Sequence, residues 1–416
     1  MTGTRPKGIS RGSIHGAGRP GDAAAATPSP FLFVMVGVSI ALFASNLYYA
    51  QPLLTTIASD LKLAPGWAGS VVSASQIGYG LGLLMLAPMA DAVENKRLVL
   101  TCWLFTLIGI VGIATARSAA AFLFFALVVG IFSSGAQILV PYLSHLIPEA
   151  RRGRVVGAIM AGVLLAVMLA RPFALFVAAA FGWRAVYCFS ALAMLGVGLG
   201  LWRTMPVRRP ERIPYHQTFL SLRSLFANER KVRRRTAYQA LLFASFTMFW
   251  AVVPMVLADL FAFSQTRIGL FALVGAGGVL AAPLAGRVSD NGSTRAGTAT
   301  ASLLIVAAFA LSIQAVEMRI MLALIAAAVV IDASIQMAQV LSRMVVLEVN
   351  SHIRGRVNAV YMTIVYLSGA AGSMLGVSLY GSFGWNVVAA LGAIAGLCVL
   401  TGTMKEKADA DDRRSL

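Results

Sequence analysis

Charged residues are scarce in this sequence. Only 12% of the 416 residues are Asp, Glu, Lys or Arg, and 58% are hydrophobic, whereas a soluble domain carries about 25% charged residues. So few polar side chains cannot cover the surface of a water-soluble globule of this length. The composition excludes a soluble domain and predicts an all-α membrane protein, because helices satisfy their own backbone hydrogen bonds in lipid.

Acidic residues are rarer than basic ones. The chain has 16 Asp and Glu against 34 Lys and Arg, which gives a net charge of +18. A nucleic-acid-binding protein would gather this charge on one face of a folded domain. Here the basic residues form short clusters between apolar runs, so we expect no nucleic-acid partner. The clusters instead match the excess of Lys and Arg in the cytoplasmic loops of membrane proteins.

Cysteine, histidine and catalytic motifs are equally sparse. The three cysteines lie inside apolar runs without paired spacing, which argues against a disulfide framework and against a metal site. The sequence contains no H-E-x-x-H pattern, no nucleophile elbow and no G-x-x-x-x-G-K-[ST] phosphate loop. We therefore expect no enzyme, no cofactor and no ATP hydrolysis. Any work that the protein does would draw its free energy from the proton gradient.

Long apolar runs are what the chain has in abundance, and about 20 such residues cross a bilayer. We predict twelve spans, in two groups of six. The first six are roughly 31–52, 67–89, 98–116, 119–143, 155–180 and 184–202. The last six are roughly 237–261, 267–286, 296–315, 320–342, 357–380 and 385–403. The domains would be a disordered basic tail (1–29), two six-helix bundles (30–202 and 237–404), a cytoplasmic linker (203–236) and a C-terminal tail (405–416).

Two landmarks occur twice at the same interval. Arg152-Gly-Arg-Val155 returns as Arg354-Gly-Arg-Val357, and Phe181-Gly-Trp183 returns as Phe383-Gly-Trp385. Both pairs are 202 residues apart (354 − 152 and 385 − 183). This predicts an internal repeat of one six-helix unit. An even number of spans per copy makes both copies cross in the same direction.

The distribution of basic residues predicts the orientation. Of the 34 Lys and Arg, 28 lie in the two termini and in the connections of one side, and five lie on the other side. The richer side is cytoplasmic by the positive-inside rule. We therefore expect a multi-pass protein of the bacterial cytoplasmic membrane, with both termini in the cytoplasm.

Three loops carry a resemblance to the major facilitator superfamily. The segment Gly286-Arg-Val-Ser-Asp290-Asn-Gly292, followed by Arg295, resembles the G-x-x-x-D-R-x-G-R motif of that family. The equivalent loop of the first copy keeps Asp91 and the pair Lys96-Arg97 but departs from the motif elsewhere. Asn46-Leu-Tyr-Tyr-Ala-Gln-Pro52 is similar to a bacterial branch grouped with twelve-helix drug:proton antiporters and sugar-efflux permeases. The antiporter signature of the fifth span expects Gly-Pro, where this chain has Ala170-Arg171-Pro172.

The resemblance implies a major facilitator fold that works by alternating access, with its substrate site between the bundles. It implies proton-coupled export of a small organic solute or drug by a monomer embedded in the bilayer. Two alternatives stay open. One is a proton-coupled uptake symporter or facilitator for a metabolite, and the other is a membrane sensor that does not transport.

Two charged residues fall near the middle of predicted spans, where ionisable groups are costly and usually functional. Arg171 lies in the fifth span and Asp332 in the tenth, while their repeat mates are Ser373 and Gly130. We predict that Asp332 binds the coupling proton and that Arg171, which stays protonated, supplies fixed charge. A static ion pair, or an arginine bonded to backbone carbonyls at Pro172, is the competing interpretation.

The resemblance places the first, fourth, seventh and tenth spans around the cavity. Polar and aromatic residues on these spans are the predicted substrate contacts: Asn46, Tyr49, Gln137, Trp250, Gln336 and Gln339. Asn46 and Tyr49 would share one helix face by their i, i+3 spacing. Phe243, Phe246 and Trp250 form an aromatic stripe, which could hold a flat solute or simply pack.

The repeat also predicts a cytoplasmic gate. Asp91 would contact the helix start at Arg356, and Asp290 would contact the start at Arg154, with Arg97 alongside. A carboxylate is stabilised at a helix N-terminus, where N–H groups are unpaired. Each contact would tie one bundle to the other.

Overall fold

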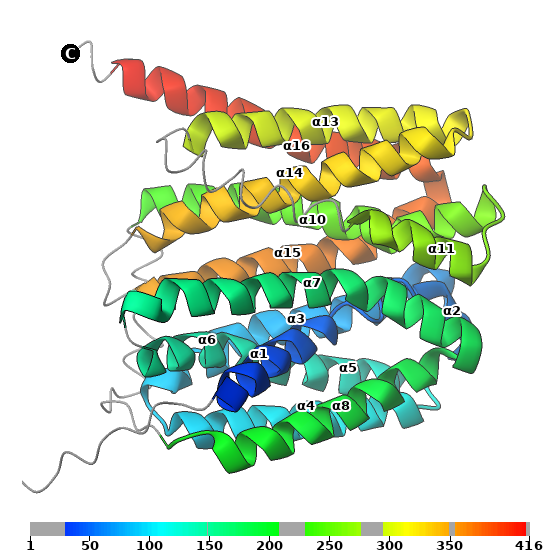
Figure 1. Ribbon diagram of the computed structural model, residues 1–416. Helices are drawn as coiled ribbons and strands as arrows, with labels where there is room; N and C mark the ends of the chain where they lie inside the picture. The colour runs from blue at the N-terminus through cyan, green and yellow to red at the C-terminus, as the bar shows by residue number, and fades with distance from the viewer. Residues whose placement is uncertain (1–29, 148, 208–228, 276–293, 349–353, 413–416) are drawn as a thin grey trace, which may run out of the picture.

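The computed structural model describes residues 30–147, 149–207, 229–275, 294–348 and 354–412. These residues form helices that run roughly side by side, and none of them forms a strand (Figure 1). The N-terminal half contains α1 (Pro30–Ser45), α2 (Leu54–Asp60), η1 (Pro65–Trp67), α3 (Ser70–Leu86), η2 (Pro88–Asp91), α4 (Asn95–Thr115), α5 (Ala119–Ser133), α6 (Gly135–Leu146), α7 (Glu149–Phe181) and α8 (Trp183–Thr204). The C-terminal half contains α10 (Arg230–Asp259), α11 (Gln265–Ala272), α13 (Thr294–Glu317), α14 (Met321–Leu347), α15 (Arg354–Phe383) and α16 (Trp385–Asp412).

The twelve predicted spans coincide with described helices, the eighth only over its first part. Ten spans are long and apolar enough to cross a membrane, and α1 is a shorter apolar helix. Helices α5 and α6 together make one of the ten. The eighth predicted span contains α11, and its residues 276–286 lie outside the described ranges.

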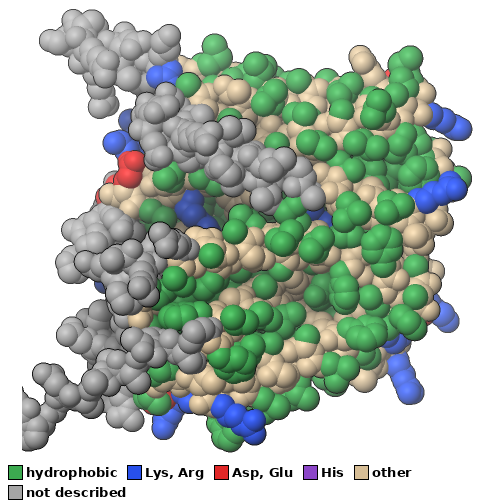
Figure 2. All heavy atoms as spheres, in the orientation of Figure 1, with side chains coloured by type: hydrophobic (Ala, Val, Ile, Leu, Met, Phe, Trp, Pro, Cys, Tyr) green, Lys and Arg blue, Asp and Glu red, His purple; other side chains and the backbone are tan. Residues whose placement is uncertain are grey.

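Large apolar side chains face outward over the described surface, as lipid contact requires. Phe124, Leu192 and Leu303 are more than half exposed. Figure 2 shows hydrophobic side chains spread across the middle of the visible face, with Lys and Arg side chains toward both ends. A surface of this kind is stable in hydrocarbon and would aggregate in water.

The bundle has two ends that matter for the site. We call the end where α1 begins and α16 finishes the terminal end, and the opposite end, where α2 and α11 lie, the far end (Figure 1). The orientation predicted from the basic residues puts the terminal end in the cytoplasm.

Three helix boundaries differ most from the prediction. The first span is not one helix to residue 52, because α1 ends at Ser45 and residues 46–53 form turns with i→i−3 hydrogen bonds, such as Gln51 N to Tyr48 O at 3.3 Å. Pro52 has no N–H and disfavours α conformation in the residue before it. Helix α10 begins at Arg230, inside the predicted linker, and α16 continues to Asp412. Lys, Arg, Glu and Ala are good helix formers, so polar segments that contain them extend α10 and α16 beyond their apolar runs.

The repeat is visible in the backbone. Gly182 lies between α7 and α8 with φ of 81°, and Gly384 lies between α15 and α16 with φ of 75°. Only glycine adopts this region without cost. The next residues, Trp183 and Trp385, are both buried. The Phe-Gly-Trp landmark is therefore the same helix–helix turn in both halves.

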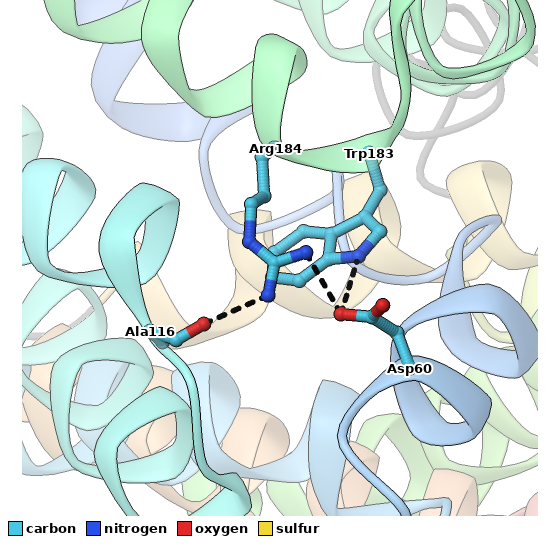
Figure 3. Close-up of polar contacts among 4 residues, drawn as sticks. All are labelled: Asp60, Ala116, Trp183 and Arg184. Carbon is cyan, nitrogen blue, oxygen red and sulfur yellow. Dashed lines mark hydrogen bonds and ion pairs between the residues drawn. The ribbon is translucent and has the colours of Figure 1, made fainter.

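The first of these turns belongs to a polar cluster at the far end (Figure 3). Arg184 Nη1 lies 2.8 Å from Asp60 Oδ2, and Arg184 Nη2 donates to the carbonyl oxygen of Ala116 at 2.9 Å. Trp183 Nε1 donates to the same carboxylate oxygen of Asp60 at 3.3 Å. Asp60 ends α2, Ala116 follows α4, and Trp183 and Arg184 begin α8, so the cluster joins three helix ends of the N-terminal half.

The two halves meet along α3 and α15 and along α7 and α11. Ser73 Oγ donates to Ala370 O at 2.7 Å across the first contact. At the far end, Gln265 Nε2 donates to Thr56 Oγ1 at 2.7 Å. These contacts close the far end of the seam between the bundles.

Candidate functional site

Asp332 lies near the middle of α14 and is buried, with only 3% of its surface exposed. Its Oδ2 accepts a hydrogen bond of 2.8 Å from Trp250 Nε1 on α10. A buried carboxylate must be hydrogen-bonded or protonated. Trp250 supplies one donor, and the carboxylate lines the central cavity described below.

Arg171 lies on α7 opposite this pair and is 5% exposed. Its Nε donates to Gln51 Oε1 at 3.1 Å. Its guanidinium carbon lies 4.4 Å from the centre of the Trp250 ring and 5.5 Å from the rings of Tyr48 and Phe246. Aromatic ring faces attract a cation at such distances. The buried guanidinium is therefore held mainly by a neutral amide and by three rings.

Neither competing interpretation of Arg171 matches this geometry. In the described part of the chain, no carboxylate lies within the 4.0 Å limit of an ion pair with Arg171. Its hydrogen bond goes to the Gln51 side chain rather than to a carbonyl at Pro172. Trp250 is shared instead, since Arg171 stacks on its ring and Asp332 accepts its N–H.

Two cavities meet at Arg171. The central cavity has a volume of about 40 Å³ and is lined by Tyr48, Val167, Met168, Arg171, Phe243, Phe246, Gly275, Asp332, Ile335, Gln336 and Gln339. The far pocket has a volume of about 10 Å³ and is lined by Pro52, Arg171, Leu175, Trp250, Val253, Pro254, Leu257, Ile268, Phe271 and Ala272. Arg171 belongs to both walls, so the guanidinium and the Trp250 ring on which it stacks separate a polar cavity from an apolar one.

A polar stripe runs along α14 from the centre toward the terminal end. Asp332, Gln336, Gln339 and Arg343 follow i, i+4, i+7, i+11 spacing and so share one helix face. Arg343 Nη2 lies 3.4 Å from Met362 Sδ on α15. The predicted tenth span ends at residue 342 and leaves Arg343 outside the membrane, but Arg343 is half-buried within α14. The same spacing in the sequence could have identified it.

The predicted contacts on the first and fourth spans are not on the cavity wall. Asn46 Oδ1 accepts from Ser190 Oγ at 2.7 Å, and the Tyr49 ring packs on Phe173 and Tyr187. Because α1 ends at Ser45, the turn that follows brings Tyr48 and Gln51 to the centre instead. Asn46 and Tyr49 therefore share one side, as their spacing predicted, but that side faces α8 and does not line the central cavity.

The other predicted contacts are near the centre. Gln336 and Gln339 line the central cavity, and Trp250 lines the far pocket. Gln137 Nε2 donates to the Tyr79 hydroxyl at 3.1 Å, and the Tyr79 ring meets Tyr366 across the seam at 4.4 Å between centroids. The aromatic stripe of α10 is divided between the two cavities, with Phe243 and Phe246 on the central one.

The predicted gate lies mostly beyond what the structure describes. Asp290 is outside the described residues, as are the side chains of Asp91 and Arg154. Arg97 Nε lies 3.5 Å from Glu94 Oε2 of its own helix start. The short helix η2, which ends at Asp91, contacts α15, the helix that carries Arg356 near its start. The gate stays a prediction. Among the described residues, no group of three or more His, Cys, Asp or Glu could hold a metal ion.

Two repeated helical halves around a buried polar centre are typical of membrane transporters. Comparisons with known proteins identify the family. The Major Facilitator Superfamily profile matches residues 34–243 and 236–413. The chain is 36% identical to the putative uncharacterized transporter YgaY of Escherichia coli strain K12 over 371 residues, which are 89% of this chain and 94% of that protein. It is 30% identical to the probable transporter SCO4007 of Streptomyces coelicolor over 376 residues, 88% and 85% of the two chains.

The fold is also similar to the folds of solved transporter structures. The crystal structure of the nucleoside transporter NupG aligns with a TM-score of 0.71 at 16% identity, covering 90% of this chain and 99% of that one. The chain belongs to the Major Facilitator Superfamily, and the family resemblance stated from its loops is confirmed.

Proposed function

We propose that this protein is a secondary active transporter that couples proton movement to the export of a small organic solute by alternating access. Membership of the transporter family supports the general class. One observation carries the coupling. Asp332 is a buried carboxylate whose hydrogen bond comes from Trp250 and which lines the cavity between the two bundles.

Asp332 would bind and release the proton. Burial opposes the charged form of a carboxylate, and a neighbouring cation favours it. Arg171 keeps its charge. Any movement of α7 relative to α14 therefore changes the balance between the protonated and the ionised form of Asp332. Rocking one bundle against the other would break the far-end contact between Gln265 and Thr56 and alter that balance in the same motion.

The resemblance of residues 46–52 to drug:proton antiporters supports export. Uptake together with protons is the second candidate, and the charge of the centre favours it. Arg171 and Arg343 outnumber the carboxylate of Asp332, so a negatively charged solute is bound best when Asp332 carries a proton. Solute and proton would then bind together and cross in the same direction.

Asp332→Asn tests the coupling directly. Purified protein is placed in liposomes that contain a pH-sensitive dye, and a panel of small organic solutes is added. The native protein should give solute-dependent proton flux, whose direction relative to the solute distinguishes export from uptake. The Asn variant should insert and fold normally but give no such flux.

Asp259→Asn is the matched control, because Asp259 is an exposed carboxylate bonded to Tyr380 at the far end of α10. It should keep the native flux. If Asp332→Asn still shows solute-dependent flux with native pH dependence, Asp332 is not the coupling site. The absence of flux with every solute of a broad panel would count against proton coupling itself.

A further inference from the structure

We infer that the central cavity binds a small organic anion, with the negative group held by Arg171 and with Arg343 on its path to the terminal end. The inference rests on the proposed transport function and names the substrate class of the same site. Its evidence is the unbalanced charge of the centre, its unpaired hydrogen-bond donors and the chemistry of its walls.

Asp332 attracts the charge of Arg171 from a distance, but among the described residues no carboxylate lies within ion-pair distance of Arg171. Its one protein hydrogen bond is to the neutral amide of Gln51. The carboxylate of Asp332 accepts from Trp250, and Arg171 stacks on the ring of the same tryptophan. A buried guanidinium is costly unless an anion pairs with it. Because Arg171 lines the central cavity, an anion there can reach the guanidinium, whose remaining N–H groups form a fork suited to a carboxylate.

Arg343 adds a second cation three helical turns away. It lies 11 residues from Asp332 on the same face of α14, a rise of about 16 Å. Its Nε is buried, and neither this atom nor the buried hydroxyl of Tyr361 has a hydrogen-bond partner in the described structure. The charge of Arg343 acts on that hydroxyl. An N–H and an O–H without acceptors, beside a cation, suit a ligand rich in acceptor oxygens.

The cavity wall selects for an organic body rather than an inorganic ion. Tyr48, Phe243, Phe246 and Ile335 supply ring and aliphatic surface, while Gln336 and Gln339 supply neutral donors and acceptors. The volume of about 40 Å³ would hold only about three waters. In this conformation the cavity therefore admits the carboxylate group and little more, and the carbon skeleton would enter when the bundles move apart.

Matched ligands test the sign of the charge. Thermal unfolding of the purified full-length protein is measured with propionate, butyrate and benzoate, with the corresponding amides, and with the corresponding primary ammonium ions. At least one carboxylate should raise the unfolding temperature with saturable dependence on concentration. Its amide and its ammonium analogue should not.

Variants then locate the site. Arg171→Gln should weaken carboxylate binding by about tenfold or more, because removing one partner of a buried charge pair is costly, and Arg171→Lys should recover part of the loss. Arg343→Gln should weaken binding by about threefold. Asp332→Asn should strengthen it, since a negative charge leaves the site. Arg267→Gln, which removes an exposed arginine at the far end, should leave binding unchanged.

The outcomes separate the two proposals. Preference for the amides or ammonium ions, or no carboxylate preferred over its amide, overturns the anion site even if proton-driven transport is found. Carboxylate binding that responds to Arg171 and Asp332 as stated, without proton flux in liposomes, supports the anion site and overturns proton coupling. If Arg171→Gln does not fold, the test rests on the other two variants. Arg343→Gln should weaken carboxylate binding and Asp332→Asn should strengthen it. Effects of the same sign on carboxylate binding overturn the inference.

Discussion

Trp250 connects the two charged side chains of the centre without letting them pair. Its N–H donates a hydrogen bond to Asp332, and the guanidinium of Arg171 stacks on its ring face. Each charge is therefore stabilised by a neutral group that stays in place when the proton leaves. A direct ion pair would instead hold Asp332 ionised, which would oppose the protonation that coupling needs.

Trp250→Phe tests this arrangement by removing the donor and keeping a ring. Asp332 loses its hydrogen bond, so the variant should be less stable by about 1.5–3 kcal/mol, the range for hydrogen bonds to charged groups. Thermal unfolding measures the loss, and proton flux should fall more than solute binding. Trp202→Phe is the control, since Trp202 is exposed on α8. Equal stability of the two variants would show that the bond to Asp332 contributes little.

At the scale of elements, hydropathy predicted the helices well and their ends poorly. Twelve apolar runs were visible because lipid selects for length and composition, and the 202-residue repeat located the paired glycine turns. Which side chains of residues 46–52 reach the centre depends on where α1 ends. Local sequence did not reveal that Tyr48 and Gln51 rather than Asn46 and Tyr49 face the centre, because the turn that rotates them is set by packing against α7 and α8. Arg343 was missed for the opposite reason, since a basic residue near a helix end was assigned to the loop.

The paired turns give a prediction with an internal control. Gly182→Ala and Gly384→Ala should each destabilise the protein by about 1 kcal/mol, because alanine is strained at positive φ. Gly196→Ala should instead be neutral or stabilising by up to about 1 kcal/mol, since Gly196 lies inside α8 with open space around it. Thermal unfolding of the three variants checks the signs. A loss at Gly196 as large as at Gly182 would mean that backbone conformation is not the cause.

At the scale of the whole molecule, the two halves are joined at the far end and enclose a polar cavity that lies toward the terminal end. Seam contacts such as Ser73 to Ala370 and Gln265 to Thr56 are single hydrogen bonds between side chains and neighbouring helices. Each contributes only about 0.5–1.5 kcal/mol. No single bond of this strength would keep the seam from opening and closing, as the proposed alternating access requires.

Locking that seam should stop the cycle. Thr56→Cys and Gln265→Cys, introduced together after the three native cysteines are replaced, place two thiols across the far end. A short bifunctional thiol reagent should join the halves and abolish solute-dependent proton flux, and a reducible linker should restore the flux on reduction. Each single cysteine variant is the control and should stay active after treatment. Full activity of the cross-linked protein would exclude far-end opening from the transport cycle.

The barrier that Arg171 and the Trp250 ring form between the two cavities also affects the membrane that the protein spans. The far pocket offers about 10 Å³ and, apart from Arg171 and the indole N–H of Trp250, is lined by hydrocarbon. A buried water needs about that volume and two to four polar partners, so a continuous file of waters cannot cross it. In this conformation the far pocket therefore gives the centre no water path to the far end. A cell that keeps many copies of this protein would lose none of its stored proton gradient through them while they wait for solute.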